Sequence, residues 1–546
     1  MKKRILFALL LVGIVGGIPF LFRPEESKGF LPGAGEKADK LIIISPHSEP
    51  MKYEFERGFR KYYKAKFGRD IYIDYRAPGG TSDIVRYIAD RFTAEFRLYW
   101  EKDEKNPPWN NEIAGAFATP GAEKNPHLPE EARLARKKFL ASDVGIGIDI
   151  FFGGGTFEHA RNAKRGYSID GGIAKRHPEY LHKDLVPVSF GGDNIYDPKG
   201  LYYGVSLSSF GICYNKKRLK EMEDGTPPER WRDLASPRFF QKIAAADPTK
   251  SGSANKSYEL IIQQAMHDSI PKGTRKPTGA QLDGAWSAGL NLVRCLMANA
   301  RVITDSAGSV THMVSTGNAV AGTAIDFYGL AQREWNSWQL GEGKEPEITY
   351  VPPKGGTTVS ADPIQLLRGA PNRKAAEAFL DYVIGPEGQK LLCYKRGIEG
   401  GPEKYILRHA PVRRDLYGKE YHKFLTDPDY APYEAAKLSF TYRGDWTGRY
   451  FSLIRILIKC IMLDVRDELV DAWKEIIAAG GPEKVPMAMK EFTSLPFTFR
   501  EASQAARLLR TGKERTALDV AATCRQWSDF ARARYRKAKE LAKQGK

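Results

Sequence analysis

The stretch that decides the fold runs from residue 202 to residue 215 and reads Tyr202-Tyr203-Gly204-Val205-Ser206-Leu207-Ser208-Ser209-Phe210-Gly211-Ile212-Cys213-Tyr214-Asn215. After it come Trp231-Arg232-Asp233-Leu234 and then Ala246-Asp247-Pro248-Thr249-Lys250-Ser251-Gly252-Ser253. These segments offer strand, turn and small hydroxyl residues, but no evident catalytic base or nucleophile. Such a composition favours holding a ligand over performing catalysis.

The chain ahead of this stretch alternates strands and helices. A continuous apolar run at 41–44 predicts a buried parallel strand, and aromatic residues between 55 and 67 follow at helical spacing. A second strand is expected at 71–75 and a second helix after residue 80, which together make a βαβ unit. Residues 99–129 are polar and Pro-rich, and we interpret them as an insertion before a strand at 144–152.

Several further segments follow in a fixed order. Asp149–Gly155 has an acidic residue, a strand and a Gly-rich turn, and Asp305–Ser309 predicts the start of a helix. Gly317–Gly322 reads as a turn into a small-residue strand. Ala370–Phe379 and Gly385–Gln389 predict a pair of helices. Each segment alone is weak evidence, but their joint order is specific.

This order resembles that of the bacterial extracellular solute-binding proteins of ABC importers, in the subgroup that takes ferric ion, polyamines, phosphonates and phosphosugars. The resemblance is strongest over residues 143–389. It implies an α/β, two-lobed periplasmic-binding-protein fold with hinge strands and a ligand cleft between the lobes, and it implies a binding protein that is not an enzyme.

The expected organisation places the solute-binding unit at residues 40–400. Lobe 1 is predicted at about 40–200 and 345–400, and lobe 2 at about 201–344. The resemblance fades beyond Gly401, so 401–546 is predicted as a mostly helical, basic extension. Within it, 450–463 is expected to be a packed helix because Arg455 and Lys459 interrupt its apolar run.

The N-terminus predicts export. Lys2-Lys3-Arg4 precedes an uncharged apolar stretch, Ile5–Phe22, that has no Ala-x-Ala-like cleavage site before Arg23. Residues 1–22 are therefore either a cleaved signal peptide or a retained anchor in the inner membrane, and 23–39 are a linker. We expect a protein of the periplasm or cell envelope whose partner is an ABC transporter permease.

Composition fits this prediction. The length of 546 residues suggests three or so domains, and five widely spaced cysteines form no disulfide framework. The net charge of +18 favours acidic partners or anionic surfaces. Nucleic acid is disfavoured as a partner because an export signal leads the chain.

Turns at the carboxyl ends of strands predict the binding site, because ligands of open α/β sheets lie there. Such turns join glycine or hydroxyl residues to a helix N-terminus, where free N–H groups favour an oxyanion. The predicted ligand contacts are Ser45, His47, Gly80, Thr81, Ser82, Gly154, Ser208, Ser251, Gly252, Ser253, Asp305, Ser306, Asp326 and Tyr328. Asp305 and Asp326 are the residues suited to hydroxyl or amine groups.

Structural roles are the alternative for many of these residues. Ser82, Ser253 and Ser306 are equally suited to capping helices, and a lone histidine such as His47 is more often structural. The prediction of a small anionic solute also leaves other functions open. One is a ferric-iron receptor. Ferric-binding relatives use neighbouring tyrosines late in the second lobe, and the corresponding strand here, 324–329, offers Tyr328 alone. The adjacent pair Tyr202-Tyr203 stands at a strand start, where packing is the expected role. A membrane-tethered sensor or scaffold module of the same fold is a further alternative, and no cofactor or metal site is expected.

Overall fold

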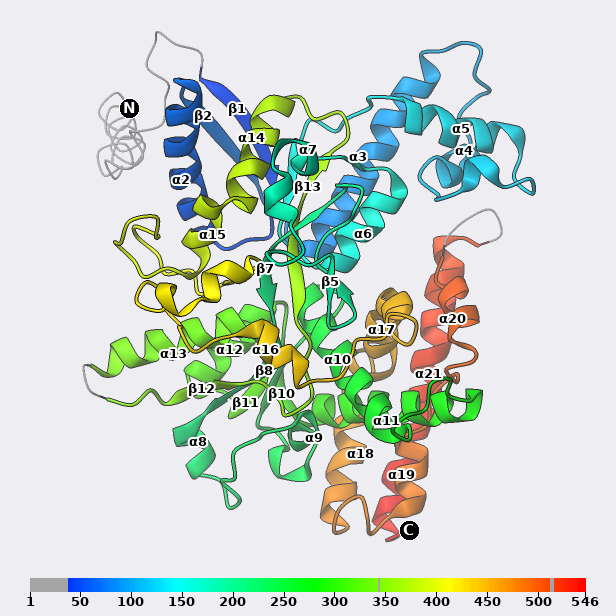
Figure 1. The fold of residues 1–546 in the computed structure, drawn as a ribbon. Helices are drawn as coiled ribbons and strands as arrows, with labels where there is room; N and C mark the ends of the chain where they lie inside the picture. The colour runs from blue at the N-terminus through cyan, green and yellow to red at the C-terminus, as the bar shows by residue number, and fades with distance from the viewer. Residues whose placement is uncertain (1–37, 342–343, 511–514) are drawn as a thin grey trace, which may run out of the picture.

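The computed structural model describes residues 38–341, 344–510 and 515–546. In this part of the chain two α/β lobes stand one above the other, and the C-terminal helices lie beside the lower lobe (Figure 1). The expected two-lobed α/β fold with a C-terminal helical region is confirmed. The predicted signal or anchor segment, residues 1–22, and most of the predicted linker lie outside the described residues.

Lobe 1 is built around a mixed sheet with the strand order β14-β7-β13-β3-β1-β2, and β4 also pairs with β13. The parallel β1–α2–β2 unit at its start confirms the predicted βαβ pattern. The strands are β1 (Asp39–Ile44), β2 (Ile71–Arg76), β3 (Ile150–Phe152), β4 (Ser168–Ile169), β7 (Tyr203–Ser208), β13 (Ser360–Leu367) and β14 (Ala410–Pro411). The predicted strand at 144–152 is too long, because Gly147 has a left-handed backbone with φ of 70° that a strand does not accommodate.

Strand β1 shows how the sequence places helices on both faces of this sheet. Leu41 and Ile43 pack in a core with the helix α2 (Glu49–Phe67), whereas Ile42 and Ile44 pack on the opposite face with α3 (Thr81–Glu101). Successive side chains of a strand point to opposite faces of the sheet, so the apolar residues of this strand contribute to the cores on both faces. The other helices of this lobe are α4 (Asn111–Ala116), α5 (Glu130–Ala141), α6 (Thr156–Arg165), α7 (Ile173–Arg176), α14 (Arg373–Ile384) and α15 (Pro386–Cys393).

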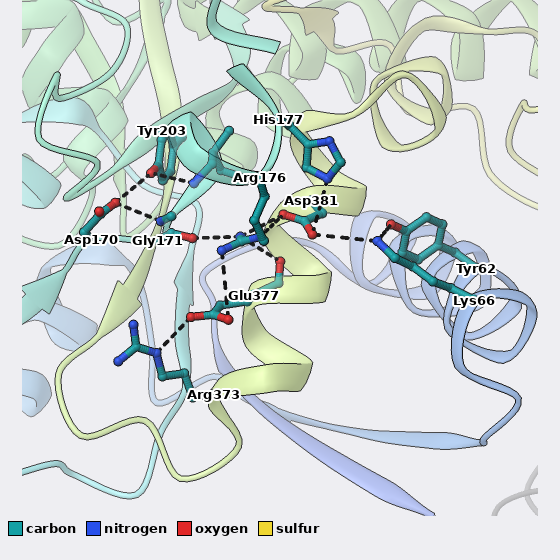
Figure 2. A network of polar contacts seen from close by, with 12 residues as sticks. Tyr62, Lys66, Asp170, Gly171, Arg176, His177, Tyr203, Arg373, Glu377 and Asp381 are labelled. Carbon is teal, nitrogen blue, oxygen red and sulfur yellow. Dashed lines mark hydrogen bonds and ion pairs between the residues drawn. The ribbon is translucent and has the colours of Figure 1, made fainter. Parts of the chain in front are cut away.

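A polar network connects α14, which follows β13 in lobe 1, to neighbouring parts of the lobe (Figure 2). Asp381 on α14 is 5% exposed, and its Oδ1 accepts hydrogen bonds from Arg176 Nε at 2.9 Å and Nη2 at 2.8 Å. Its Oδ2 lies 3.5 Å from His177 Nε2 and 3.8 Å from Lys66 Nζ. One carboxylate thus joins α7 and α2 to α14 and holds the loops that precede β7.

Lobe 2 is built around a second mixed sheet with the order β10-β9-β11-β8-β12. Its strands are β8 (Phe210–Asn215), β9 (Ile243–Ala246), β10 (Ala300–Thr304), β11 (Ala321–Ile325) and β12 (Ile348–Val351). Its helices are α8 (Lys216–Lys220), α9 (Trp231–Leu234), α10 (Gly252–Ser269), α11 (Gly279–Asn299), α12 (Ala307–Ser315) and α13 (Asp326–Leu340). A strand-to-helix turn precedes both α10 and α12, as the sequence predicts.

The chain crosses between the sheets at two places before residue 400. Ser209 alone separates β7, in the sheet of lobe 1, from β8, in the sheet of lobe 2. The chain returns between β12 and β13, that is, between residues 351 and 360. The first crossing comes later than the limit near 200 that the sequence suggests, because the quoted stretch 202–215 contributes one strand to each sheet. The return comes later than the limit near 344, because β12 still belongs to the sheet of lobe 2.

The C-terminal region is part of both lobes and not an appended extension. Leu407, Val412 and Tyr433 pack in the core of lobe 1, and Trp446 and the helices that follow pack in the core of lobe 2. The helices are α16 (Pro432–Lys437), α17 (Phe451–Ile458), the π-helical turn η8 (Lys459–Leu463), α18 (Arg466–Ala478), α19 (Pro486–Phe492), α20 (Ala502–Leu508) and α21 (Ala517–Lys543). Residues 450–463 form a packed helix, as predicted.

The basic residues of α21 are largely neutralised by its neighbours. Arg532 and Arg536 both bond to Glu468 on α18, and Arg534 bonds to Glu491 on α19. The predicted basic character of this region therefore serves, in part, to join its own helices. Within the described ranges, no helix combines the length and the apolar character that crossing a bilayer requires.

Candidate functional site

A cavity of about 700 Å³ lies between the lobes. Lobe 1 contributes the turns before α3 and α6, and lobe 2 contributes the turns before α10 and α12. The strand β13 forms part of the wall with Ser360, Ala361 and Asp362. The C-terminal region closes one side with His409, Tyr442 and Phe451.

Four helices begin at this cavity. Thr81 of α3, Thr156 of α6, Gly252 of α10 and Ala307 of α12 are the first residues of their helices, and all of them line it. The first N–H groups of a helix have no partner within the helix, and the helix dipole places partial positive charge at the same end. Four such ends around one cavity create an environment that favours negative charge.

The residues that begin these helices differ in part from the predicted caps. Ser306 caps α12, since its Oγ accepts a hydrogen bond from Ser309 N at 3.2 Å. For α10 the cap is Ser251, whose Oγ accepts from Ala254 N at 3.2 Å, and not Ser253. Gly80 precedes α3, so Ser82 lies in its first turn and is not a cap.

The two lobes touch across the cavity. A Cβ atom on Gly80 would lie 3.0 Å from the carbonyl oxygen of Lys250, and one on Gly252 would lie 3.7 Å from Thr81 Cβ. Within lobe 1, Gly154 has a φ of 96° and packs against the Thr81 side chain. The glycines therefore allow the ends of α3 and α10 to approach closely, and the structure has the lobes closed together.

Several charged groups of the wall have ion-pair partners. Lys250 Nζ lies 2.7 Å from Asp305 Oδ1, which links the turns before α10 and α12. Lys256 Nζ lies 2.9 Å from Glu259 Oε2 and 3.9 Å from Asp193 Oδ2 of lobe 1. Burial raises the pKa of Asp193 above its ordinary value, with the Lys256 ammonium acting in the opposite direction.

Two histidines lie at the hinge side. His47 Nε2 is 3.4 Å from Asp362 Oδ2, and the His47 ring packs edge-on against Phe152. His409 stacks on Phe327 with 4.0 Å between ring centroids, and its Nδ1–H donates to Leu407 O at 2.7 Å. Burial lowers the pKa of His409 to about 4, so this ring is neutral at pH 7.

Two polar atoms at the cavity lack a partner. Ser208 Oγ and His47 Nδ1 are buried and have no hydrogen-bond partner among the described residues. Both residues line the cavity. A buried polar atom without a partner costs free energy, so contact with a ligand is a prediction for these two atoms.

The structure brings most of the predicted contacts together. The predicted residues that line the cavity are His47, Gly80, Thr81, Gly154, Ser208, Ser251, Gly252, Ser253, Asp305, Ser306 and Tyr328. They come from segments up to about 280 residues apart in the sequence, and the carboxyl ends of the strands gather them. Contact with a ligand stays a prediction for each of them.

The remaining three predicted residues lie outside the cavity wall. Ser45 is buried beneath it, where its Oγ accepts from His47 N at 3.1 Å. Ser82 Oγ accepts from Arg455 Nη1 at 2.9 Å. Asp326 lies at the hinge, where Ser209 N donates to its Oδ2 at 2.8 Å and the Tyr430 hydroxyl donates to the same oxygen.

These protein partners occupy the side chains that we expected a ligand to use. For Asp326, burial raises the pKa to about 6 despite the hydrogen bonds that lower it. The sequence could not show these partners, because Arg455 and Tyr430 lie in the C-terminal region, beyond the segments that carry the resemblance.

The sequence analysis did not identify several of the cavity residues. Phe157 and Glu158 follow the Gly-rich turn at 153–155, which could have indicated them. His409, Tyr442 and Phe451 come from the C-terminal region, where no motif points to a site. Among the described residues, no group of three or more His, Cys, Asp or Glu is arranged to hold a metal ion.

Residues 142–406 match the family model described as bacterial extracellular solute-binding protein. The match covers the region in which the ordered segments lie, and it confirms the resemblance that they indicate. Proteins of this family bind solutes, which agrees with the expectation of a binding protein and not an enzyme.

Curated relatives match parts of the chain. The phosphoglycerate transport regulatory protein PgtC of Salmonella typhimurium (strain LT2) is 26% identical over 189 residues, which are 35% of this chain and 40% of that protein. An uncharacterised protein of Haemophilus influenzae is 26% identical over 250 residues, 46% of this chain and 61% of the relative. The chain thus spans less than two thirds of the length of these relatives.

A solved structure aligns with the chain over a longer range. The periplasmic binding protein AfuA from Actinobacillus pleuropneumoniae, solved with fructose-6-phosphate bound, is 17% identical. The alignment covers 77% of this chain and 99% of that protein, with a TM-score of 0.46.

Proposed function

We propose that this chain, whose residues 142–406 match the bacterial extracellular solute-binding proteins, is an extracytoplasmic receptor that captures a small solute bearing a phosphate, phosphonate or similar oxyanion. The solute lies in the cavity between the lobes and is passed to the permease of an ABC importer. The observation that carries this proposal is the convergence of four helix N-termini on one cavity.

The polar groups of the wall suit an oxyanion. Thr81, Ser251, Ser253 and Ser306 add hydroxyl donors to the backbone N–H groups of the helix ends. The Ser208 hydroxyl, which has no partner among the described residues, adds another. Hydrogen bonds to a charged group contribute about 1.5 to 3 kcal/mol each, so a few of them account for tight binding.

The rest of the cavity suits an organic body. A volume of about 700 Å³ is typical of sites for organic ligands and much larger than a bare phosphate needs. Phe157, Phe210 and Phe451 offer apolar and aromatic contacts. Asp193 and Asp362 lie on the wall as acceptors for hydroxyl or amine groups of the same solute.

The PgtC relative supports an organic phosphate, because its name refers to phosphoglycerate transport. Phosphoglycerate carries a phosphate and a carboxylate on a short carbon chain. A molecule of this kind would present two anionic groups, and the cavity has helix N-termini on both of its lobes.

Calorimetry with 3-phosphoglycerate and with inorganic phosphate tests the oxyanion site. We expect the double variant Thr81→Ala/Ser253→Ala to bind the better of these probes at least about tenfold more weakly, from the loss of charged hydrogen bonds. The matched control is Thr93→Ala/Ser257→Ala. Those two residues lie on the same helices and bond to carbonyl groups of their own helix, at Ala89 O and Ser253 O.

Each result decides between functions. Unchanged affinity in the Thr81/Ser253 variant, or binding of neither probe, would remove the oxyanion site. Binding of Fe³⁺ with a phenolate-to-metal absorption would favour the ferric-iron receptor, with Tyr328 as the tyrosine at the cavity. Mass spectrometry of whatever solute co-purifies with the protein identifies the natural ligand class directly. If the protein retains no solute but captures a sensor protein, the sensor or scaffold function is favoured.

The location of the receptor has its own test. We propose that export leaves the protein in the periplasm, either free after cleavage or held at the inner membrane by Ile5–Phe22. Cell fractionation followed by intact-mass measurement separates the two. A soluble periplasmic species that lacks the first two dozen or so residues would exclude anchoring.

A further inference from the structure

Arg455 belongs to lobe 2 but contacts lobe 1. It lies on α17, whose Leu453, Ile454 and Leu457 pack in the core of lobe 2. The start of this helix is also tied to α10 of that lobe, since Asn255 Nδ2 donates to Phe451 O at 2.9 Å. The position of the Arg455 side chain is therefore set by lobe 2.

Its partners are at the ends of the two lobe 1 helices that begin at the cavity. Arg455 Nη1 donates to Ser82 Oγ in the first turn of α3 at 2.9 Å. Arg455 Nη2 donates to Glu158 Oε1 in the first turn of α6 at 3.0 Å. The Arg455 side chain is 11% exposed and that of Glu158 is 3% exposed, so this is a nearly buried ion pair across the lobe interface.

An aromatic contact accompanies the ion pair. The Arg455 guanidinium lies 5.1 Å from the centroid of the Phe451 ring, and that ring lies 4.8 Å from the ring of Phe157 in lobe 1. Both phenylalanines line the cavity. The contact between α17 and α6 thus contains both an apolar contact, Phe451 with Phe157, and an ion pair, Arg455 with Glu158.

Glu158 gives the pair a role at the site. Glu158 lines the cavity, and its nearly buried carboxylate would repel an anionic solute beside it if it were not neutralised. Its other oxygen, Oε2, lies 2.9 Å from Arg161 Nη2, three residues along the same helix. The Arg161 contact lies within one helix and does not depend on the position of lobe 2, whereas the Arg455 contact depends on α17 of lobe 2 lying against α6.

We propose that Arg455 is a closure latch: it holds the closed lobes together and, in doing so, completes the neutralisation of Glu158 beside the ligand. It is a positioning residue, because it acts through Glu158 and Ser82. The role of the latch in ligand binding rests on the proposed receptor function. The contact between Arg455 and lobe 1 can be tested without knowing the solute.

Removing Arg455 leaves Glu158 partly unpaired in the closed state and fully hydrated in the open state. Loss of one partner of a buried ion pair is strongly unfavourable, but Arg161 still pairs with the second oxygen of the Glu158 carboxylate and reduces this cost. We therefore expect Arg455→Met to lower the ratio of closed to open molecules by about tenfold or more. Arg455→Lys keeps the charge but loses the two-pronged geometry, so its effect should be smaller.

Small-angle X-ray scattering of the full chain, without ligand and with saturating inorganic phosphate, tests the proposal. The Arg455→Met variant should have a larger radius of gyration than the unmodified protein in the condition where the latter is compact. Arg161→Met is the matched control, because it removes a partner of the same carboxylate that lobe 1 itself supplies, three residues along the same helix. It should stay compact. Arg455→Met/Glu158→Gln should regain compactness, since neither charge is then left alone.

Unchanged scattering of Arg455→Met in both conditions would overturn the latch, and so would an equal expansion in Arg161→Met or no recovery in the double variant. If circular dichroism shows that Arg455→Met does not fold, Ser82→Ala/Glu158→Gln removes the hydroxyl acceptor and the carboxylate charge from the lobe 1 side and should expand the protein in the same direction. Calorimetry with phosphate on the unmodified protein reports the proposed function separately, because the ligand-free scattering comparison stands without it.

Discussion

Residues 142–406 and residues 407–546 contribute to the same cavity in different ways. The first region, which matches the solute-binding family, supplies glycines, hydroxyl residues and the starts of α6, α10 and α12. The second region supplies large side chains, namely His409, Tyr442 and Phe451. The difference teaches that turns which bind through glycines, hydroxyl groups and backbone N–H groups leave a recognisable sequence pattern. Isolated large side chains that line a cavity leave no such pattern.

The two regions are also joined in one core. Trp446, Leu457 and Trp473 pack with Ile243 and Leu290 in the interior of lobe 2. A division of the chain into a binding unit and an appendage is therefore physically misleading. Variants that act differently on the two regions can test this interdependence.

The largest effect is expected for Trp473→Ala in α18. This side chain is 1% exposed, and its Nε1–H donates to Asn299 Oδ1 at 2.8 Å in the family-matched region. Its truncation should cost about 3 to 5 kcal/mol of the free energy of unfolding, measured by urea denaturation. Hydrogen exchange should show lost protection in β9 as well.

The control is Trp338→Ala on α13, which is 72% exposed and should change the stability little. If Trp473→Ala unfolds the C-terminal helices while β9 keeps its full protection, the two regions are independent and the comparison fails.

The second prediction concerns one buried histidine from each region. Burial lowers the pKa of both His159 and His409 to about 4. The unfolded chain binds these protons near pH 6.5, so the stability that each neutral ring provides is fully present above that pH and is lost as the pH falls toward 4. Each should add a slope of up to about 1.4 kcal/mol per pH unit over that window.

Urea denaturation between pH 7 and pH 5 measures this slope. His159→Phe and His409→Phe should each reduce it in the same unfolding transition, because the two regions form one structure. The unmodified protein, measured over the same pH range, is the reference. A slope that neither buried-site variant reduces would contradict the prediction.

The smallest effect is expected for the ion pairs of α21. Glu468→Gln removes the shared partner of Arg532 and Arg536, both of which are partly hydrated. The cost should be about 0.2 to 1 kcal/mol at low salt and should shrink at 1 M salt, where charges are screened. Thermal denaturation at two salt concentrations measures it. A salt-independent loss of several kcal/mol would instead place this carboxylate among the essential contacts.

The fold was largely predictable from the sequence because its strands have strong local signals. The run at 41–44 and the stretch 202–215 are apolar enough to specify buried strands, and both lobes follow from their order. The interruption at Gly147 was not predictable, since a glycine in an apolar run is compatible with either a strand or a left-handed turn.

The site was predictable where it depends on helix starts. Thr81, Ser251 and Ser306 lie at the cavity because strand-to-helix turns gather at one edge of each sheet. Asp326 and Ser82 were predicted to contact the ligand but lie outside the cavity wall, because their side chains bond to Tyr430 and Arg455 of the C-terminal region. Long-range partners of this kind depend on tertiary packing that local patterns do not encode.

The shared core of lobe 2 has a consequence for how the chain folds as it is made. Its sheet is complete by Val351, but its covering helices begin only at Phe451, about 100 residues later. At a synthesis rate of about 5 to 20 residues per second, roughly 5 to 20 seconds pass between these two points. During that interval the apolar faces of α10 and α11 lack their cover, so an incomplete lobe 2 exposes apolar surface until its last helices have been made.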